Sequence, residues 1–75
     1  MNYLRNEKLL ENFGARIKAL RQERGLSLLA LANECDMELS QVHRIEQGKI
    51  NTTLSTLQAL AKGLNVPMSE LLEKL

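Results

Sequence analysis

Aromatic side chains are almost missing from this chain of 75 residues, which contains Tyr3, Phe13 and no tryptophan. The core must therefore be built from aliphatic side chains, mostly leucine, and leucine favours helices over strands. Hydrophobic residues make up 44% and charged residues 25% of the chain, which is ordinary for a globular domain and too apolar for a disordered one. The length suffices for one domain and is too short for two. We expect a single all-α domain over residues 1–75.

Cysteine and histidine are equally scarce, since Cys35 and His43 are single examples of each. One thiol cannot form an internal disulfide, and the two side chains together fall short of a zinc-ligand set. No nucleophile with a neighbouring base, glycine-rich phosphate loop or pair of carboxylates stands out. We therefore expect no catalytic site, metal, cofactor or small-molecule substrate, and we interpret Cys35 as a packed core residue.

Long hydrophobic runs are also lacking. The first twelve residues mix both signs of charge and have no apolar run of the kind found in signal peptides. No stretch approaches the roughly 20 apolar residues of a membrane-spanning helix. These observations predict a cytoplasmic protein with no membrane partner.

What the chain does contain is apolar residues at helical spacing, in five segments separated by Gly, Asn, Asp and Pro. Ser27 suits the N-cap of a short second helix, and Gly25 and Gly48 suit positions directly after helix C-termini. The expected helices run over about 6–24, 28–35 and 38–47, then from a Thr52 or Thr53 cap to Asn65, and from Pro67 to about Leu75. The pattern predicts a compact five-helix domain.

The second and third helices are separated by a break that allows only a sharp turn. Ala32 lies where these helices would cross, and Val42 and Ile45 supply the inward face of the third. Such a pair is a helix-turn-helix, which places its second helix in the DNA major groove and its first helix across it.

The run from Gly14 to Leu72 resembles the Cro/C1-type phage-repressor family, also called the XRE family. The resemblance rests on RIKALRQERGLS, the pair Leu31-Ala32, RIEQGK, the Leu-x-x-Leu-x-x-Leu-Ala run of the fourth helix, and the closing Val66 to Leu72. Each piece alone is weak, but their order and spacing together are specific. The match covers about residues 13–72 and leaves residues 1–9 as an N-terminal extension. It implies a lambda-repressor-like fold and a DNA-binding transcriptional regulator.

The resemblance also implies roles for individual residues. Bases would be read from the third helix at Glu38, Leu39, Ser40, His43 and Arg44. Arg44 could donate two hydrogen bonds to guanine O6 and N7, the commonest specific contact. Phosphates would be bound by helix N-terminal amides and by Ser27, Gln47, Lys49 and Asn51. The alternative for Arg44 and Lys49 is a solvated surface charge.

A structural ion pair is implied as well. In the family, an arginine of the first helix pairs with a glutamate near the end of the recognition helix, and Arg21 and Glu46 occupy the matching positions here. A bidentate pair would fix the third helix against the first. The alternative is that both are free surface charges.

Three positions depart from the family pattern. Leu28 stands where a phosphate-binding Gln is common, Asp36 where the turn usually has Gly, and Glu38 where a Ser usually caps the third helix. Asp accepts a left-handed backbone less readily than Gly but better than most residues. A Glu38 carboxylate could accept a hydrogen bond from cytosine N4, whereas a phosphate would repel it.

Two functions of different classes therefore remain open. The first is a homodimeric regulator of a palindromic operator, of which an antitoxin or a restriction-modification controller would be a subtype. Its candidate dimer surfaces are the N-terminal residues Tyr3 and Leu4 and the apolar face of the fifth helix (Met68, Leu71, Leu72 and Leu75). The alternative is a protein-interaction module with little DNA affinity. It is favoured by the net charge of −3 over residues 25–47, where Arg44 opposes four acidic residues, and by Leu28, Leu29 and Leu39 on the expected DNA side.

Overall fold

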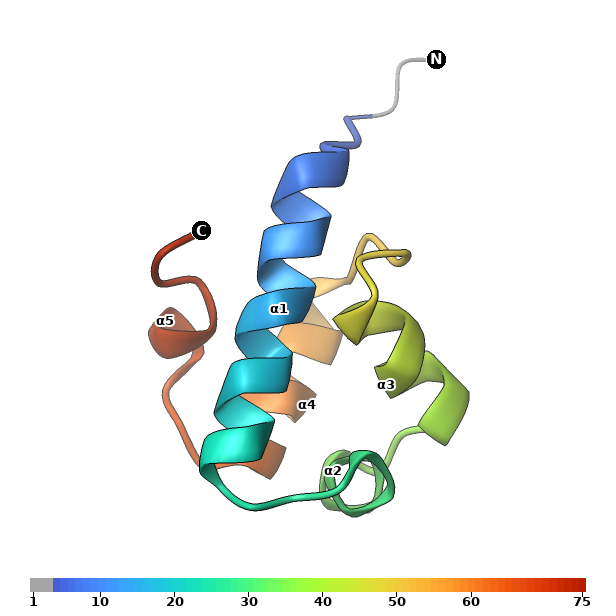
Figure 1. Cartoon of the computed structure of the whole chain (residues 1–75), viewed down its shortest axis with the longest axis vertical. Helices are drawn as coiled ribbons and strands as arrows, with labels where there is room; N and C mark the ends of the chain where they lie inside the picture. Colours follow the sequence, from blue (N-terminus) through green and yellow to red (C-terminus); the bar gives the residue numbers. More distant parts are fainter. Residues whose placement is uncertain (1–3) are drawn as a thin grey trace.

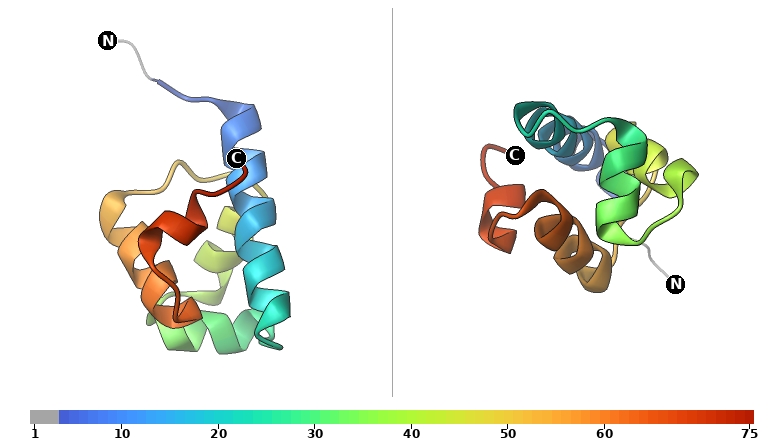
Figure 2. Two further views of the ribbon diagram at one scale, coloured as in Figure 1. Left: turned by 90° about the vertical axis from the view of Figure 1, so that its left-hand side faces the viewer. Right: turned by 90° about the horizontal axis from the view of Figure 1, so that it is seen from below.

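Five α-helices make up the computed structural model, which describes residues 4–75 and has no strand in that range. The helices are α1 (Glu7–Glu23), α2 (Leu28–Cys35), α3 (Leu39–Glu46), α4 (Leu54–Leu64) and α5 (Met68–Leu71). The long α1 packs against both α3 and α5, and α2 packs against α3 and α4. Seen from below, α5 lies on the opposite side of the molecule from the α2–α3 pair (Figures 1 and 2). The expected all-α, five-helix architecture is confirmed, and Tyr3 lies outside the described residues.

Short polar side chains start three of the helices. The side chains of Asn6, Ser27 and Thr53 accept hydrogen bonds from the backbone N–H groups of Leu9, Ala30 and Thr56, at 3.0, 3.0 and 3.2 Å. Each bond satisfies an N–H group that has no partner inside its helix. Of the two threonines expected to cap α4, Thr53 is therefore the one that does so.

Four helices end in the same way, with a residue at positive φ directly after the last turn. These residues are Gly25, Asp36, Gly48 and Asn65, with φ of 68°, 55°, 75° and 58°. At each end the next residue donates its N–H back into the helix; Lys49, for example, donates to the Arg44 carbonyl at 2.9 Å. This arrangement satisfies the last free carbonyls and turns the chain sharply. Asp36 and Asn65 hold it without glycine because short polar side chains tolerate the left-handed region.

The fifth helix is shorter than expected. The apolar spacing predicted a helix from Pro67 to about Leu75, but α5 ends at Leu71 and Lys74 has a φ of 61°. Side chains of α1 bond backbone oxygens of this segment, one of which, the Glu70 carbonyl, a longer helix would use. Arg16 Nε donates to the Glu70 carbonyl at 3.0 Å, and Asn12 Nδ2 donates to the Leu75 carbonyl at 3.2 Å. Tertiary contacts therefore override the local pattern.

The core is aliphatic except for Phe13 and Cys35. Its other buried members come from all five helices: Ile17, Leu20, Leu31, Ala32, Val42, Ile45, Leu60, Ala61, Leu64 and Leu71. Burial raises the pKa of the Cys35 thiol to about 11, and the nearby charge of Glu34 adds to this. The thiol is therefore protonated and unreactive at neutral pH.

Two glycines allow helices to approach closely. A Cβ at Gly14 would lie 2.5 Å from the carbonyl oxygens of Ile45 and Glu46, and a Cβ at Gly63 would overlap the Cys35 sulfur. Gly14 therefore lets α1 cross the end of α3, and Gly63 lets α4 cross the end of α2. Both crossings fix where the α2–α3 pair sits.

Candidate nucleic-acid interface

One face of α3 points to solvent. Leu39, Ser40, His43, Arg44 and Gln47 are exposed, and successive residues are turned by about 100° along a helix, so these five positions share one side. The opposite side carries Val42 and Ile45, which are 0% and 1% exposed. Leu39, Ser40, His43 and Arg44, four of the five residues implied for base reading, therefore lie together on an open helix face, and Glu38 lies before it at the N-cap.

The turn before α3 leaves the N-terminus of that helix open. Asp36 adopts the left-handed conformation, and Glu38 occupies the N-cap position but makes no capping hydrogen bond with its side chain. The exposed Glu38 carboxylate is thus free to point away from the helix. Even so, the negative charge of Glu38 stays near the backbone N–H groups at the N-terminus of α3, and it opposes the attraction of an anion to them.

Arg21 and Glu46 hold the far end of α3 against α1. Arg21 Nε donates to Glu46 Oε2 at 2.7 Å, and Nη2 donates to Oε1 at 3.0 Å. The two side chains are 13% and 6% exposed, and Arg21 Nη1 also donates to the Leu26 carbonyl at 2.9 Å. The hydrogen bond with Glu46 raises the pKa of Arg21 more than desolvation lowers it. A bidentate, largely buried pair of this kind fixes orientation as well as charge.

The residues implied for phosphate binding lie in two places. Ser27 precedes α2, where its hydroxyl oxygen is occupied by the Ala30 N–H and its hydroxyl proton remains available. Gln47, Lys49 and Asn51 lie together in the segment after α3 and are all exposed. Asn51 differs from the other two, because its Nδ2 donates to the Leu4 carbonyl at 3.4 Å.

Charge is divided along the α2–α3 pair. Acidic side chains surround the turn before α3, at the exposed Glu34, Asp36 and Glu38. Lys49 lies beyond the other end of α3, next to Arg5, whose Nη2 donates to the Lys49 carbonyl at 3.1 Å and whose Nε pairs with Glu7 at 2.6 Å. The basic end is where a phosphate backbone would be attracted. Sequence reasoning missed Arg5 because no local pattern signals a contact between residues so far apart in the chain.

The chain is similar to known regulators over most of its length. A family model described as helix-turn-helix matches residues 17–71. The chain belongs to the helix-turn-helix family. It is 41% identical to the immunity repressor protein of Bacillus phage phi105 over 56 residues, which are 75% of this chain and 39% of that protein. It is 37% identical to the control protein C.MunI of a Mycoplasma species over 60 residues, 79% of this chain and 81% of that protein.

Solved structures agree with this membership. The restriction-modification controller protein C.AhdI from Aeromonas hydrophila superposes with a TM-score of 0.81 at 33% identity, covering 88% of this chain and 98% of that one. The resemblance to Cro/C1-type proteins is thereby confirmed, and members of this helix-turn-helix family are DNA-binding transcriptional regulators. The chain spans 39%, 45% and 35% of the length of three curated relatives, the phage repressor among them.

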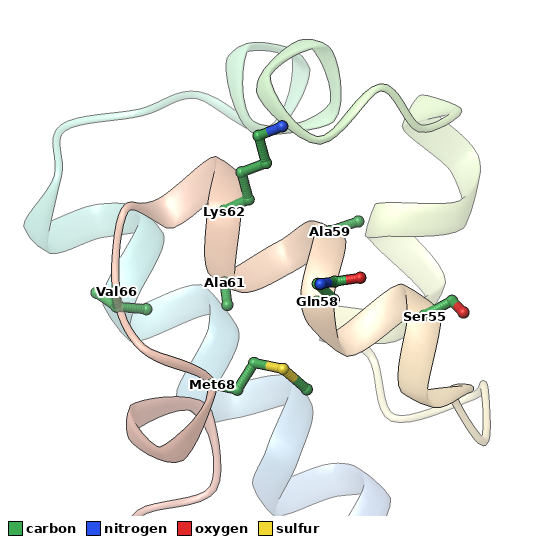
Figure 3. Close-up of a pocket in the computed structure, with 7 residues that line it drawn as sticks. All are labelled: Ser55, Gln58, Ala59, Ala61, Lys62, Val66 and Met68. Atoms are coloured by element: carbon green, nitrogen blue, oxygen red, sulfur yellow. The ribbon is translucent and has the colours of Figure 1, made fainter.

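A separate groove on this helix-turn-helix protein lies between α4 and α5. It is lined by Ser55, Gln58, Ala59, Ala61, Lys62, Val66 and Met68 (Figure 3). Lys62 is its one ionisable group, and its side chain extends away from Met68 in the close-up. No group of three metal-ligating side chains occurs among residues 4–75, and no helix there is long and apolar enough to cross a membrane. Because Lys62 is the one ionisable group of the groove, the groove offers no pair of groups for acid–base chemistry.

Proposed function

We propose that this protein is a sequence-specific DNA-binding transcriptional regulator that inserts α3 into the major groove. The observation that carries the proposal is the open face of α3, whose far end is fixed to α1 by the Arg21–Glu46 pair. A helix held in this way presents its outward side chains in one geometry, which base reading requires. Base contacts would come from Glu38, Leu39, Ser40, His43 and Arg44.

We further propose that the protein acts as a homodimer on a palindromic operator. One recognition helix covers only a few base pairs, so specificity normally needs two half-sites about one DNA turn apart. Leu4 is 94% and Leu72 is 51% exposed, so both could join a dimer contact. Leu71, at 0% exposure, is a core residue and drops out of that surface. Such a regulator would work with DNA in the cytoplasm.

A controller role in restriction–modification is one narrower candidate. The chain covers 98% of the C.AhdI chain and 92% of C.Esp1396I, both of which are described as restriction-modification controller proteins. The likeness to these two controllers, at 33% and 29% sequence identity, is what supports the controller subtype.

A protein-interaction module remains the second candidate function. Leu29 and Leu39 are 55% and 44% exposed on the α2–α3 pair, beside the acidic turn. Exposed apolar side chains next to acidic ones suit a protein surface better than a phosphate backbone.

Selection from random duplex DNA at low salt, followed by titration of two variants, tests the main proposal. Arg44→Ala should cost about 1–3 kcal/mol on the selected site and relax the preference for one guanine. Lys49→Ala should weaken selected and random duplexes equally and lower the salt slope by about one. Each variant is the control for the other. Equal behaviour of the two on both duplexes would contradict the division into base and phosphate contacts, and the absence of an enriched palindrome would contradict the dimer.

A further inference from the structure

The segment before the family match contacts the loop after α3 at successive points. Gly14 lies against the carbonyls of Ile45 and Glu46, and a Cβ on Gly48 would lie 2.8 Å from Glu11 Cα. Farther toward the N-terminus, Arg5 Nη2 donates to the Lys49 carbonyl at 3.1 Å, and Asn51 Nδ2 donates to the Leu4 carbonyl. Residues 4–14, here called the N-terminal segment, thus run alongside the α3–α4 loop (residues 47–53).

Apart from the buried Gly48 and the backbone bonds that close α3, the loop has few other supports. Its half-buried members are Thr52 and Ile50, and only Ile50 is a hydrophobic residue packed against the core. The Lys49 N–H is used to close α3, and the Lys49 carbonyl accepts a hydrogen bond from Arg5. Arg5 is itself oriented by Glu7, whose Oε1 accepts from Arg5 Nε at 2.6 Å. Arg5 and Asn51 are therefore the polar side chains that tie the loop to the N-terminal segment.

We propose that Arg5 is a positioning residue for DNA-backbone binding, which holds the α3–α4 loop so that Lys49 meets a phosphate at the end of the recognition helix. This inference rests on the proposed function. A phosphate contact made from a loop that is already ordered avoids the entropy cost of ordering it on binding. Because the family match begins at residue 17, Arg5 adds this support from outside the matched domain. Asn51, implied by the resemblance as a phosphate ligand, belongs to the same support.

The first test uses the free protein. Amide hydrogen exchange of residues 48–51 should become several-fold faster in Arg5→Gln, since exchange reports local opening. Arg16→Gln is the matched control, because Arg16 also bonds a backbone carbonyl and a carboxylate, at Glu70 and Glu73, but on the α5 side. Unchanged exchange at residues 48–51 in Arg5→Gln would overturn the proposal.

The second test is a double-mutant cycle on DNA. Arg5→Gln should weaken binding to a random duplex by about 3- to 10-fold, the range for one lost hydrogen bond. The effect of Lys49→Gln should then be smaller in the Arg5→Gln background than in the unsubstituted protein. Arg16→Gln should leave the effect of Lys49→Gln unchanged. Additive effects of Arg5→Gln and Lys49→Gln would make Arg5 an independent charge and overturn the positioning role. No binding by the unsubstituted protein at low salt would instead overturn the proposed function, and the DNA role of Arg5 with it.

Discussion

Among single side chains, Arg21 and Glu46 depend most strongly on each other. Their side chains are 13% and 6% exposed, so removing one partner leaves the other charge largely buried and unpaired. We expect Arg21→Ala and Glu46→Ala each to lower the free energy of unfolding by about 2–4 kcal/mol, near the range for breaking a buried pair. The double variant should lose less than the sum. Urea unfolding of the four proteins measures this, and additive losses would mean that the two side chains do not act together.

Cys35 gives the chain a predictable response to alkaline pH. Its pKa is about 11 in the folded protein, above the usual value of 9.0, so the folded state binds the proton more tightly than the unfolded state does. The stabilisation is complete below pH 9 and is lost as the pH rises from 9 to 11. The difference in unfolding free energy between the unsubstituted protein and Cys35→Ala should therefore shrink over that range. Parallel curves for the two proteins would contradict the prediction, because every other titrating group is common to both.

At the scale of helices, the sequence predicted the elements whose ends are determined locally. Caps at Ser27 and Asn6 and left-handed residues after four helices are chemical signals within a few residues of the boundary, so those bounds could be predicted to within one or two residues. The end of α5 could not, because it depends on bonds from α1 side chains. The same difference between local and long-range signals decides how much of the candidate interface could be predicted. The face of α3 follows from helical spacing, whereas the contact of Arg5 with the α3–α4 loop is a long-range hydrogen bond.

Helix crossings explain a position that sequence reasoning left unremarked, Gly63 in α4. Replacing a glycine inside a helix by alanine usually stabilises by about 0.5–1 kcal/mol, but here the new Cβ would overlap the Cys35 sulfur. We expect Gly63→Ala to destabilise by about 1–3 kcal/mol, as overpacking does. In the Cys35→Ala background the sulfur is gone and only backbone atoms of Glu34 and Cys35, at 3.3 Å, still crowd the new Cβ, so the same change should cost much less.

Gly14→Ala is the matched control for Gly63→Ala. A Cβ there would meet backbone carbonyls, which no substitution removes, so Gly14→Ala should destabilise in both backgrounds. Thermal unfolding of the single and double variants measures the effects. An equal cost of Gly63→Ala with and without the sulfur would show that the crossing is limited by something other than Cys35.

For the whole molecule, the distribution of charge matters more than the total of +1. The acidic turn and the basic end of α3 give the proposed DNA-binding side opposite charges at its two ends, so orientation on the duplex should depend on charge as well as shape. Lys49 supplies the attraction at the basic end, and Glu38 opposes it at the acidic end. The DNA-binding and protein-interaction hypotheses differ most sharply in what they expect of Glu38.

Glu38→Gln removes that charge while keeping the length and hydrogen-bonding capacity of the side chain. If α3 enters the major groove, affinity for random duplex should rise by about 2- to 10-fold at low salt, because non-specific binding is largely electrostatic. Affinity for a selected site should rise less, or fall, if the carboxylate accepts a hydrogen bond from cytosine N4 there. Glu70→Gln makes the same change of charge on α5, on the opposite side of the molecule (Figure 2), and should alter binding far less because exposed charges are screened beyond about 10 Å. Titration of the three proteins at two salt concentrations separates the hypotheses. Flat curves for all three proteins at low salt would exclude DNA binding and leave the protein-interaction module. In that case Leu29→Lys or Leu39→Lys should abolish binding of a protein partner, because each places a charge in an apolar contact.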